Sequence, residues 1–142
     1  MALVKTITNP INGHADSYWR VTAINIDAPA QVAVIMLGGY KDANWRANGG
    51  QPNQSREIIA RGADFVALAT SPAAGQTVFD VLAGAAYEFV RTKRRPIPAG
   101  ATWHTDEEDV VTGVTLPGGE YFAAAAIVDH TVPSEFADAA NG

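Results

Sequence analysis

Two β-type runs separated by a short break constrain the fold of this chain most. Residues 18–26 and residues 31–40 both alternate along their length, and residues 27–30 between them contain Pro29, which cannot donate to a strand ladder. Because the connection is so short, we expect the two runs to pair as an antiparallel hairpin. Apolar residues lie on both faces of the first run, so we expect that strand to be covered on both sides for part of its length.

Further segments extend this hairpin into a small sheet. Residues 55–61 form a third β-type run, and its pairing with the hairpin would make an antiparallel meander. The polar segment 41–54, rich in Asn and Gly, predicts a loop with one helical turn around residues 44–47. The apolar run at residues 65–69 predicts a further short strand, and residues 71–75 predict a turn after it.

The segment 77–94 has the pattern of an amphipathic helix. Thr77 and Asp80 fit a capping box, in which a hydroxyl and a carboxylate satisfy free N–H groups at the helix start. Pro96 ends the segment, since proline cannot continue a helix. The apolar positions at helical spacing, which we expect to pack against the sheet, are Val78, Phe79, Leu82, Ala86, Phe89 and Val90.

The sequence after this helix predicts a second, smaller β element. Residues 99–109 are polar and predict a connector. Two apolar runs, 110–116 and 121–128, flank Pro117–Gly119 and predict a hairpin. The alanines at 123–126 are also compatible with a helix, because alanine is the best helix former; flanking β-branched and aromatic residues favour a strand.

These elements predict an α+β protein: a small antiparallel β-meander packed by one amphipathic helix, with a C-terminal β-hairpin extension. Residues 1–17 contain turn signals and predict an N-terminal arm. Residues 18–95 form the predicted core domain. Residues 96–142 form the hairpin extension, in which residues 129–142 predict a flexible tail.

Composition excludes several classes of function. The net charge of -5 and the pI of about 5.0 argue against a nucleic-acid partner, which would require a basic surface. No cysteine is present, so disulfides, thiolate metal sites and a cysteine nucleophile are excluded. Residues 1–13 lack the apolar run of a signal peptide, and no segment has the ~18 apolar residues of a membrane span. We therefore expect no membrane partner and synthesis in a cytoplasm.

No pattern of residues indicates catalysis or cofactor binding. No serine lies in a nucleophile-elbow motif, and we expect a protein that is not an enzyme and has no catalytic residues. His104 precedes four consecutive acids, residues 106–109, and this is the one cluster of candidate metal ligands. The cluster lacks the spacing of a calcium loop, so we expect a solvated loop with no metal and no cofactor.

Aromatic and basic residues mark candidate interfaces. Four aromatic residues of the hairpin and the following loop are expected near one end of the sheet, either as an interface or as a cap on the open end of the core. The basic residues that follow the helix fit either a dock for an acidic partner or a complement to the helix dipole. The candidate interface residues are Tyr18, Trp19, Arg20, Tyr40, Trp45, Arg46, Arg94 and Arg95.

Several short motifs together resemble small proteins encoded among the structural genes of tailed bacteriophages. The resemblance covers roughly residues 17–95, and residues 96–142 depart from it. The helix containing Ala85-Ala86-Tyr87 also looks similar. The matching motifs are Tyr18-Trp19-Arg20, Gly39-Tyr40-Lys41-Asp42, Arg46, Gly49-Gly50-Gln51-Pro52 and Arg56.

The resemblance implies a structural component of a phage particle, located in the virion and made in the bacterial host cytoplasm. It would act by assembly with other phage structural proteins, as a homo-oligomer, at the tail tip, baseplate or fibre attachment. One alternative is a capsid decoration protein that clamps neighbouring capsid subunits. Another is a small carbohydrate-binding module that stacks exposed Trp and Tyr on sugars.

Overall fold

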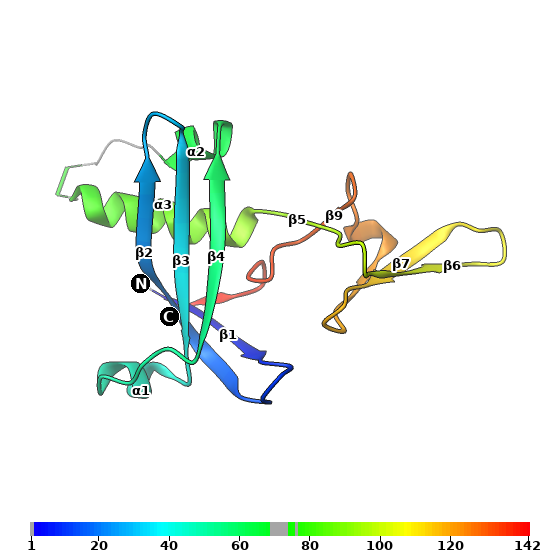
Figure 1. Cartoon of the computed structure of the whole chain (residues 1–142), viewed down its shortest axis with the longest axis horizontal. Helices are drawn as coiled ribbons and strands as arrows, with labels where there is room; N and C mark the ends of the chain where they lie inside the picture. Colours follow the sequence, from blue (N-terminus) through cyan, green and yellow to red (C-terminus); the bar gives the residue numbers. More distant parts are fainter. Residues whose placement is uncertain (1, 69–73, 76) are drawn as a thin grey trace. The chain divides into compact units, whose positions relative to one another are not determined.

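The computed structural model describes residues 2–68, 74–75 and 77–142 (Figure 1). The chain forms two compact units. Unit 1 comprises residues 1–91 together with residues 138–142, and unit 2 comprises residues 92–137. The C-terminus therefore returns to the first unit after the second is complete.

Unit 1 is built on a five-stranded antiparallel sheet in the order β10-β1-β2-β3-β4. The β2–β3–β4 part is the predicted meander, and the predicted α+β class is confirmed. The strands are β1 (Leu3–Thr8), β2 (Ala15–Asp27), β3 (Val32–Tyr40), β4 (Gln54–Arg61) and β10 (Ala140–Asn141).

A β-bulge explains the two-faced pattern of the first strand. The register of β2 against β3 shifts between Val21 and Ala23, so Thr22 is the additional residue. Beyond the bulge, Ile24 and Ile26 lie on the same side of the sheet as Val21, although simple alternation would place them opposite. The pattern that predicted cover on both sides therefore arises from a change of register within the strand.

Three helices accompany this sheet. Helix α1 (Ala43–Ala47) is the predicted helical turn. Helix α2 (Ala63–Leu68) occupies most of the segment that was predicted to be a strand, so that prediction is wrong. A six-residue run directly after Gly62, where the chain must leave the sheet edge, closes helical hydrogen bonds locally, as from Val66 N to Gly62 O. The turn predicted at residues 71–75 lies largely outside the described residues.

Helix α3 (Val78–Thr92) is the predicted amphipathic helix and crosses one face of the sheet (Figure 1). Its capping box is present: Asp80 N donates to Thr77 Oγ1 over 3.1 Å, and Thr77 N donates to Asp80 Oδ2 over 3.3 Å. The buried side of the helix carries Ala86, Tyr87 and Val90. Tyr87 Oη accepts a 2.9 Å hydrogen bond from Val21 N, which fixes the helix on β2.

The predicted apolar stripe of α3 is only partly buried. Phe79 is 82% exposed, so its assignment to the core is wrong. It lies in the first turn of the helix, beyond the part that Tyr87 joins to the sheet. The side chain of Val78 lies outside the described part of the chain.

Unit 2 is built on a three-stranded antiparallel sheet, β6-β7-β8, and a two-stranded ribbon, β5-β9. Its small core consists of Val114, Leu116 and Val132, with Ile97 and Phe122 among the partly buried residues packed on it. The elements are β5 (Arg95–Pro96), β6 (Thr102–Thr105), β7 (Val111–Thr115), β8 (Tyr121–Ala123), the 3-10 turn η1 (Ala124–Ala126) and β9 (Thr131–Val132).

The hairpin predicted around Pro117–Gly119 is present as β7 and β8, with a shorter second strand. The preference for strand at the alanine run is wrong beyond Ala123, because the next three alanines form η1. The segment predicted to be a polar connector contains β6, whose Thr, Trp and His side chains gave no apolar alternation.

Both ends of the chain are strands, which differs from the predicted arm and tail. Leu3 is fully buried in β1, and the β10 residues Ala140 and Asn141 pair with β1. Phe136 is also buried, so residues 129–142 are ordered by packing rather than flexible. Residues 3–8 become a strand mainly by pairing with β2, and the two residues of β10, too few to show a strand pattern, take β1 as their ladder partner.

Candidate functional site

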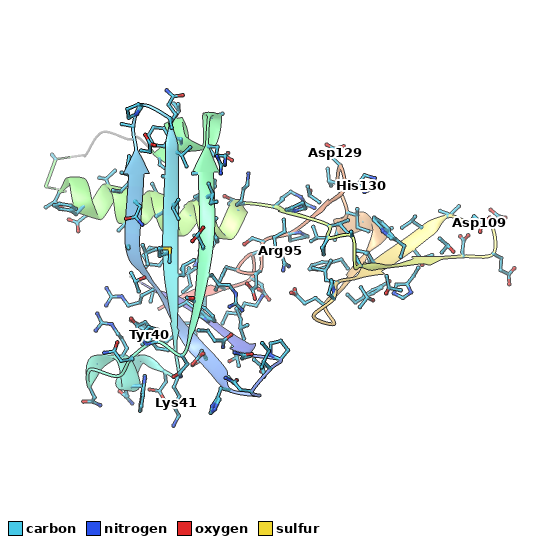
Figure 2. The ribbon with its side chains drawn as sticks, viewed as in Figure 1. Tyr40, Lys41, Arg95, Asp109, Asp129 and His130 are labelled. Carbon is cyan, nitrogen blue, oxygen red and sulfur yellow. The ribbon has the colours of Figure 1, made fainter. Side chains whose placement is uncertain are left out.

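The structure places the predicted aromatic residues at one end of the unit 1 sheet, on two different faces. Tyr18 lies directly opposite Tyr40, and Trp19 lies opposite Gly39. Neighbouring residues of a strand point to opposite sides, so Tyr18 and Trp19 cannot share one surface. Tyr40 is the last residue of β3, next to Lys41 (Figure 2).

Trp19 belongs to the core, so its assignment to an interface is wrong. Its side chain is 0% exposed. Nε1 donates to Lys5 O over 2.9 Å, and the guanidinium carbon of Arg56 lies 5.3 Å from the ring centroid. Tyr40 is 7% exposed and is likewise largely withdrawn from solvent. For these two residues, the interpretation as a cap on the open end of the core fits the structure.

Trp45 remains available on the surface, at 44% exposure. Asp42 caps the start of α1 by accepting a 2.7 Å hydrogen bond from Trp45 N, and Trp45 Nε1 donates to Gln51 O over 2.9 Å. The guanidinium carbon of Arg46 lies 5.9 Å from the ring centroid of Tyr40. Tyr18, Arg20 and Arg46 are half-buried beside this end of the sheet, so only part of the predicted aromatic surface can meet a partner.

The motifs behind the family resemblance form one structural cluster. The indole of Trp19 requires Gly39, and the indole of Trp45 requires Gly50, because a Cβ at either position would collide with the ring. Asp42 starts the short helix that carries Trp45. These residues therefore determine how the end of the sheet is built, and the motif pattern describes packing more directly than a binding surface.

Arg94 and Arg95 are engaged inside unit 2. Arg94 donates from Nη2 to Ala126 O over 2.6 Å and from Nε to Thr131 Oγ1 over 2.8 Å. Arg95 forms a bidentate pair with Glu120, both distances being 3.1 Å. Both arginines therefore support the fold of unit 2, a role that neither the dock nor the dipole interpretation had anticipated.

Sequence reasoning also missed a buried polar network in unit 1. Asp16 is 0% exposed, and its carboxylate accepts hydrogen bonds from Asn53 Nδ2 over 2.8 Å and from Gln54 Nε2 over 2.7 Å. Gln54 Nε2 also donates to Ile7 O over 3.1 Å. The network joins β1, β2 and β4, and its signal in the sequence is weak because its members lie far apart along the chain.

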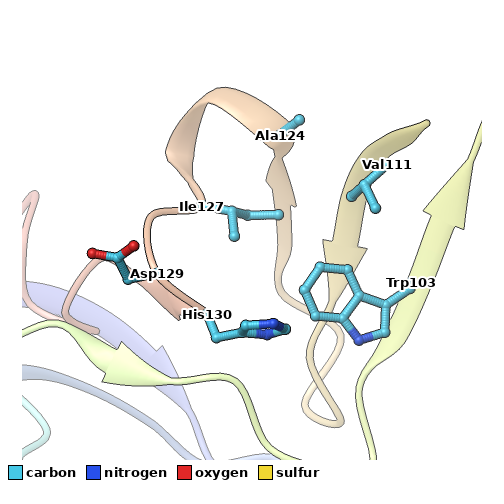
Figure 3. A pocket seen from close by; sticks show the side chains of 6 residues that line it. All are labelled: Trp103, Val111, Ala124, Ile127, Asp129 and His130. Atoms are coloured by element: carbon cyan, nitrogen blue, oxygen red, sulfur yellow. The ribbon is translucent and has the colours of Figure 1, made fainter.

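An open pocket of about 380 Å³ lies in unit 2 (Figure 3). Its walls are mostly apolar, and the rings of Trp103 and His130 meet edge to face with centroids 5.7 Å apart. The carboxylate of Asp129 points away from Trp103 in this view, so it lies at the rim (Figure 3). The lining residues are Trp103, Val111, Ala124, Ile127, Asp129 and His130.

A tight turn presents His130 to this pocket. Asp129 and His130 both have positive φ, at 49° and 58°, between Val128 and Thr131, which bridge each other. Two consecutive left-handed residues are the signature of a type I′ turn, and Asp and His are among the side chains that tolerate this conformation. The Asp-His dipeptide is the signal for this turn in the sequence.

The acidic run after His104 forms an exposed hairpin loop. Asp106 Oδ1 accepts hydrogen bonds from Glu108 N over 2.8 Å and from Val110 N over 3.0 Å, and Asp109 lies at the tip (Figure 2). Within residues 2–68, 74–75 and 77–142, no group of three or more His, Asp or Glu residues is arranged to hold a metal ion. His104 Nε2 instead lies 2.8 Å from Thr115 Oγ1.

Most of the net negative charge of the chain lies in unit 2. Unit 2 has three Lys and Arg residues against seven Asp and Glu residues, which gives it a net charge of -4 with neutral His. Unit 1 has seven against eight, so its net charge is -1. A partner of unit 2 is therefore favoured if its contact surface is neutral or basic.

Comparisons of the chain with protein-family models, with curated proteins and with solved structures found no match. Of the helices in the described part of the chain, none has the length and apolar character needed to cross a membrane.

Proposed function

We propose that the chain is a structural component of a tailed-bacteriophage particle that acts by protein–protein assembly at the tail tip, baseplate or fibre attachment. The observation that carries this proposal is the apolar surface of unit 2. Its core is small, and large apolar side chains remain exposed around it. These exposed residues are Trp103, Val110, Val111, Tyr121 and Val128.

Such a surface is expected on a protein that is covered by a neighbour. A few residues at the centre of an interface, most often Trp, Tyr and Arg, supply most of the binding free energy, and a pocket that accepts one large side chain is a typical anchor site. The pocket beside Trp103 is lined mainly by apolar groups and has room for such a side chain. The phage-like motifs of unit 1 support the same class of protein.

Capsid decoration is the alternative within the same class. A protein of that kind would clamp neighbouring capsid subunits with its N-terminal segment and its C-terminal hairpin. Because Leu3–Thr8 is a strand in the unit 1 sheet, the N-terminal segment is not free to act as a clamp without losing its pairs with β2 and β10. This favours the tail region over the capsid shell.

Carbohydrate binding is supported by one specific observation. The indole of Trp103 is 40% exposed at a pocket that His130 also lines, and sugars bind by stacking on aromatic rings beside polar groups. A glycan array, followed by titration of any positive glycan against wild-type protein and Trp103→Ala, tests this function. Binding that Trp103→Ala abolishes would favour the carbohydrate module over assembly.

The proposed location can be tested on intact particles. Phage particles from host cells that carry this gene would be purified, analysed by mass spectrometry and labelled with gold-conjugated antibodies for electron microscopy. Label at the distal end of the tail supports the proposal. Label over the capsid shell supports decoration, and a protein present in the lysate but absent from purified particles would overturn both.

A further inference from the structure

Among the described residues, each unit has one outer strand of four or more residues whose outer side has no strand partner. In unit 1 the outer strands are β10, which has two residues, and β4, which has eight. In unit 2 the outer strands are β6, whose four residues are all exposed, and β8, which continues directly into η1. In the part of the chain that the structure describes, no strand pairs with the outer side of β4 or β6.

Natural proteins usually protect such edges with proline, charged side chains, bulges or a covering element, because an open edge recruits further strands. β6 contains no proline and no charged residue, whereas β4 contains no proline and carries Arg56, Glu57 and Arg61. We propose that β6 of one copy of this chain pairs with β4 of a second copy. This inference rests on the proposed assembly function and names its partner, which is the same protein.

Charge favours this pairing over a β6–β6 contact. Pairing β6 with β6 would bring together two units that each carry a net charge of -4. Pairing β4 with β6 instead places an edge with two arginines next to the acidic unit.

The side chains of the two strands are also complementary. A strand added to the edge of β6 places alternate side chains next to Trp103, on the face that borders the pocket. On β4, Ile58 and Ile59 point to opposite faces and are both half-buried, so either face of the edge offers a β-branched side chain. Aromatic and β-branched residues form favourable cross-strand pairs.

A contact of this kind is heterologous, because it uses two different surfaces of the chain. Each copy that joins through its β6 still has an unpaired β4, so a further copy can be added. The result is a ring if the rotation between copies closes, and a filament if it does not. The proposed assembly is thus a ring or fibre of identical copies joined edge to edge.

Single-cysteine variants test the pairing directly, since the chain has no native cysteine. Cysteine would be introduced into β4 as Ser55→Cys or Glu57→Cys, and into β6 as Thr102→Cys or Thr105→Cys. All four residues are exposed at the two edges. Variants would be mixed pairwise under mild oxidation with glutathione disulfide, and dimers would be resolved on non-reducing gels. Ile11→Cys, in the exposed turn between β1 and β2, measures the rate of random collision.

We expect at least one mixed β4–β6 pair to form disulfide dimers at least tenfold faster than either variant alone and than Ile11→Cys. A double variant, Glu57→Cys with Thr105→Cys, should give a ladder of oligomers if these positions are in register. Trp103→Ala, added to the fastest pair, should reduce its rate. Fast β6–β6 or β4–β4 dimers would overturn the proposal in favour of a symmetric contact, and rates equal to those of Ile11→Cys would overturn self-pairing altogether.

The outcome is separable from that of the proposed function. If antibody label places the protein on the tail while no cysteine pair forms faster than the control, this inference fails and the structural role stands. If the protein is absent from particles, the proposed function fails whatever the cysteine pairs show.

Discussion

Gly39 lies directly opposite Trp19 in the β2–β3 ladder, and the indole fills the space that a side chain at position 39 would occupy. A Cβ at Gly39 would lie 2.6 Å from Trp19 Cη2. The indole is fully buried and hydrogen-bonded to Lys5 O, so it cannot move aside without losing that bond. We expect Gly39→Ala to lower the free energy of unfolding by about 1–3 kcal/mol. Urea denaturation followed by circular dichroism measures this change.

Gly84 provides the matched control. It lies in the middle of α3, and a Cβ there would meet nothing within 4 Å. Alanine is favoured over glycine inside a helix, so Gly84→Ala should raise the free energy of unfolding by about 0.5–1 kcal/mol. Equal effects of the two substitutions would contradict the packing role of Gly39.

The Asp16 network should be sensitive to the exchange of a single atom. In Asp16→Asn, one carboxylate oxygen becomes an NH2 group that faces the amide donors of Asn53 or Gln54. A buried donor without an acceptor costs about 1–3 kcal/mol, and we expect a loss of stability in that range by urea denaturation. Asp27→Asn is the control, because Asp27 is exposed and its Oδ1, which accepts from Ala30 N, is kept in asparagine. If Asp16→Asn left the free energy of unfolding unchanged, this would show that the network can rearrange.

The sequence allowed the β-meander, the main helix with its cap and the second hairpin to be predicted, because each depends on local periodicity and on turn residues. The hairpin could be predicted because the connection between the two runs has only four residues, Pro29 among them, and so short a connection favours antiparallel pairing. Pairings between segments far apart in the sequence could not be predicted. The β1–β10 ladder joins residues near opposite ends of the chain, and the two residues of β10 are too few to carry a strand pattern.

The candidate site was less predictable than the fold because exposure depends on tertiary packing. Trp19 and Trp45 are each followed by an arginine in the sequence, yet Trp19 is buried with its Nε1 hydrogen-bonded to Lys5 O, and Trp45 lies on the surface. The pocket in unit 2 combines Trp103 with His130, which a local pattern cannot connect across 26 intervening residues. Ion pairs such as Arg95 with Glu120 could not be predicted either, because the two residues lie far apart along the chain.

Stability should depend on pH through the C-terminal return to unit 1. Lys5 Nζ lies 2.7 Å from Asp138 Oδ1, and the hydrogen bond from Lys5 holds the pKa of the Asp138 carboxyl below its usual range, although partial desolvation opposes this. A group whose pKa is lowered by folding stabilises the fold above its unfolded pKa, and that contribution is lost as the pH falls through the lowered value.

Asp138→Asn should therefore reduce stability slightly at pH 7 and have a smaller effect at low pH, where wild-type Asp138 becomes protonated. The carboxylate is largely exposed, so 1 M NaCl should also shrink the difference at pH 7. Urea midpoints of the two proteins at pH 7 and pH 3, with and without salt, measure the effect. A difference that persists unchanged at pH 3 would show that the ion pair is not its source.

Lysine in place of Arg95 should lower the stability of unit 2, because Arg95 makes several contacts at once within that unit. Its guanidinium donates to both carboxylate oxygens of Glu120, and its Nε donates to Pro133 O over 3.0 Å. The guanidinium carbon lies 5.6 Å from the ring centroid of Phe122. A lysine ammonium has no planar fork and cannot keep this geometry. Since Glu120 is partly exposed, we expect Arg95→Lys to destabilise unit 2 by about 1 kcal/mol.

Hydrogen exchange measured by NMR can separate this effect from global destabilisation. In Arg95→Lys, amides in the small core of unit 2, such as Val114 and Val132, should exchange about fivefold faster, which corresponds to about 1 kcal/mol. The amide of Ile35, in the core of unit 1, should be unchanged, because Glu120, Phe122 and Pro133, which the Arg95 guanidinium contacts, all lie in unit 2. Glu107→Gln, an exposed change in the acidic loop, should leave all three rates as they are. Equal acceleration in both units would show that they unfold as one, and that Arg95 stabilises the whole chain rather than unit 2.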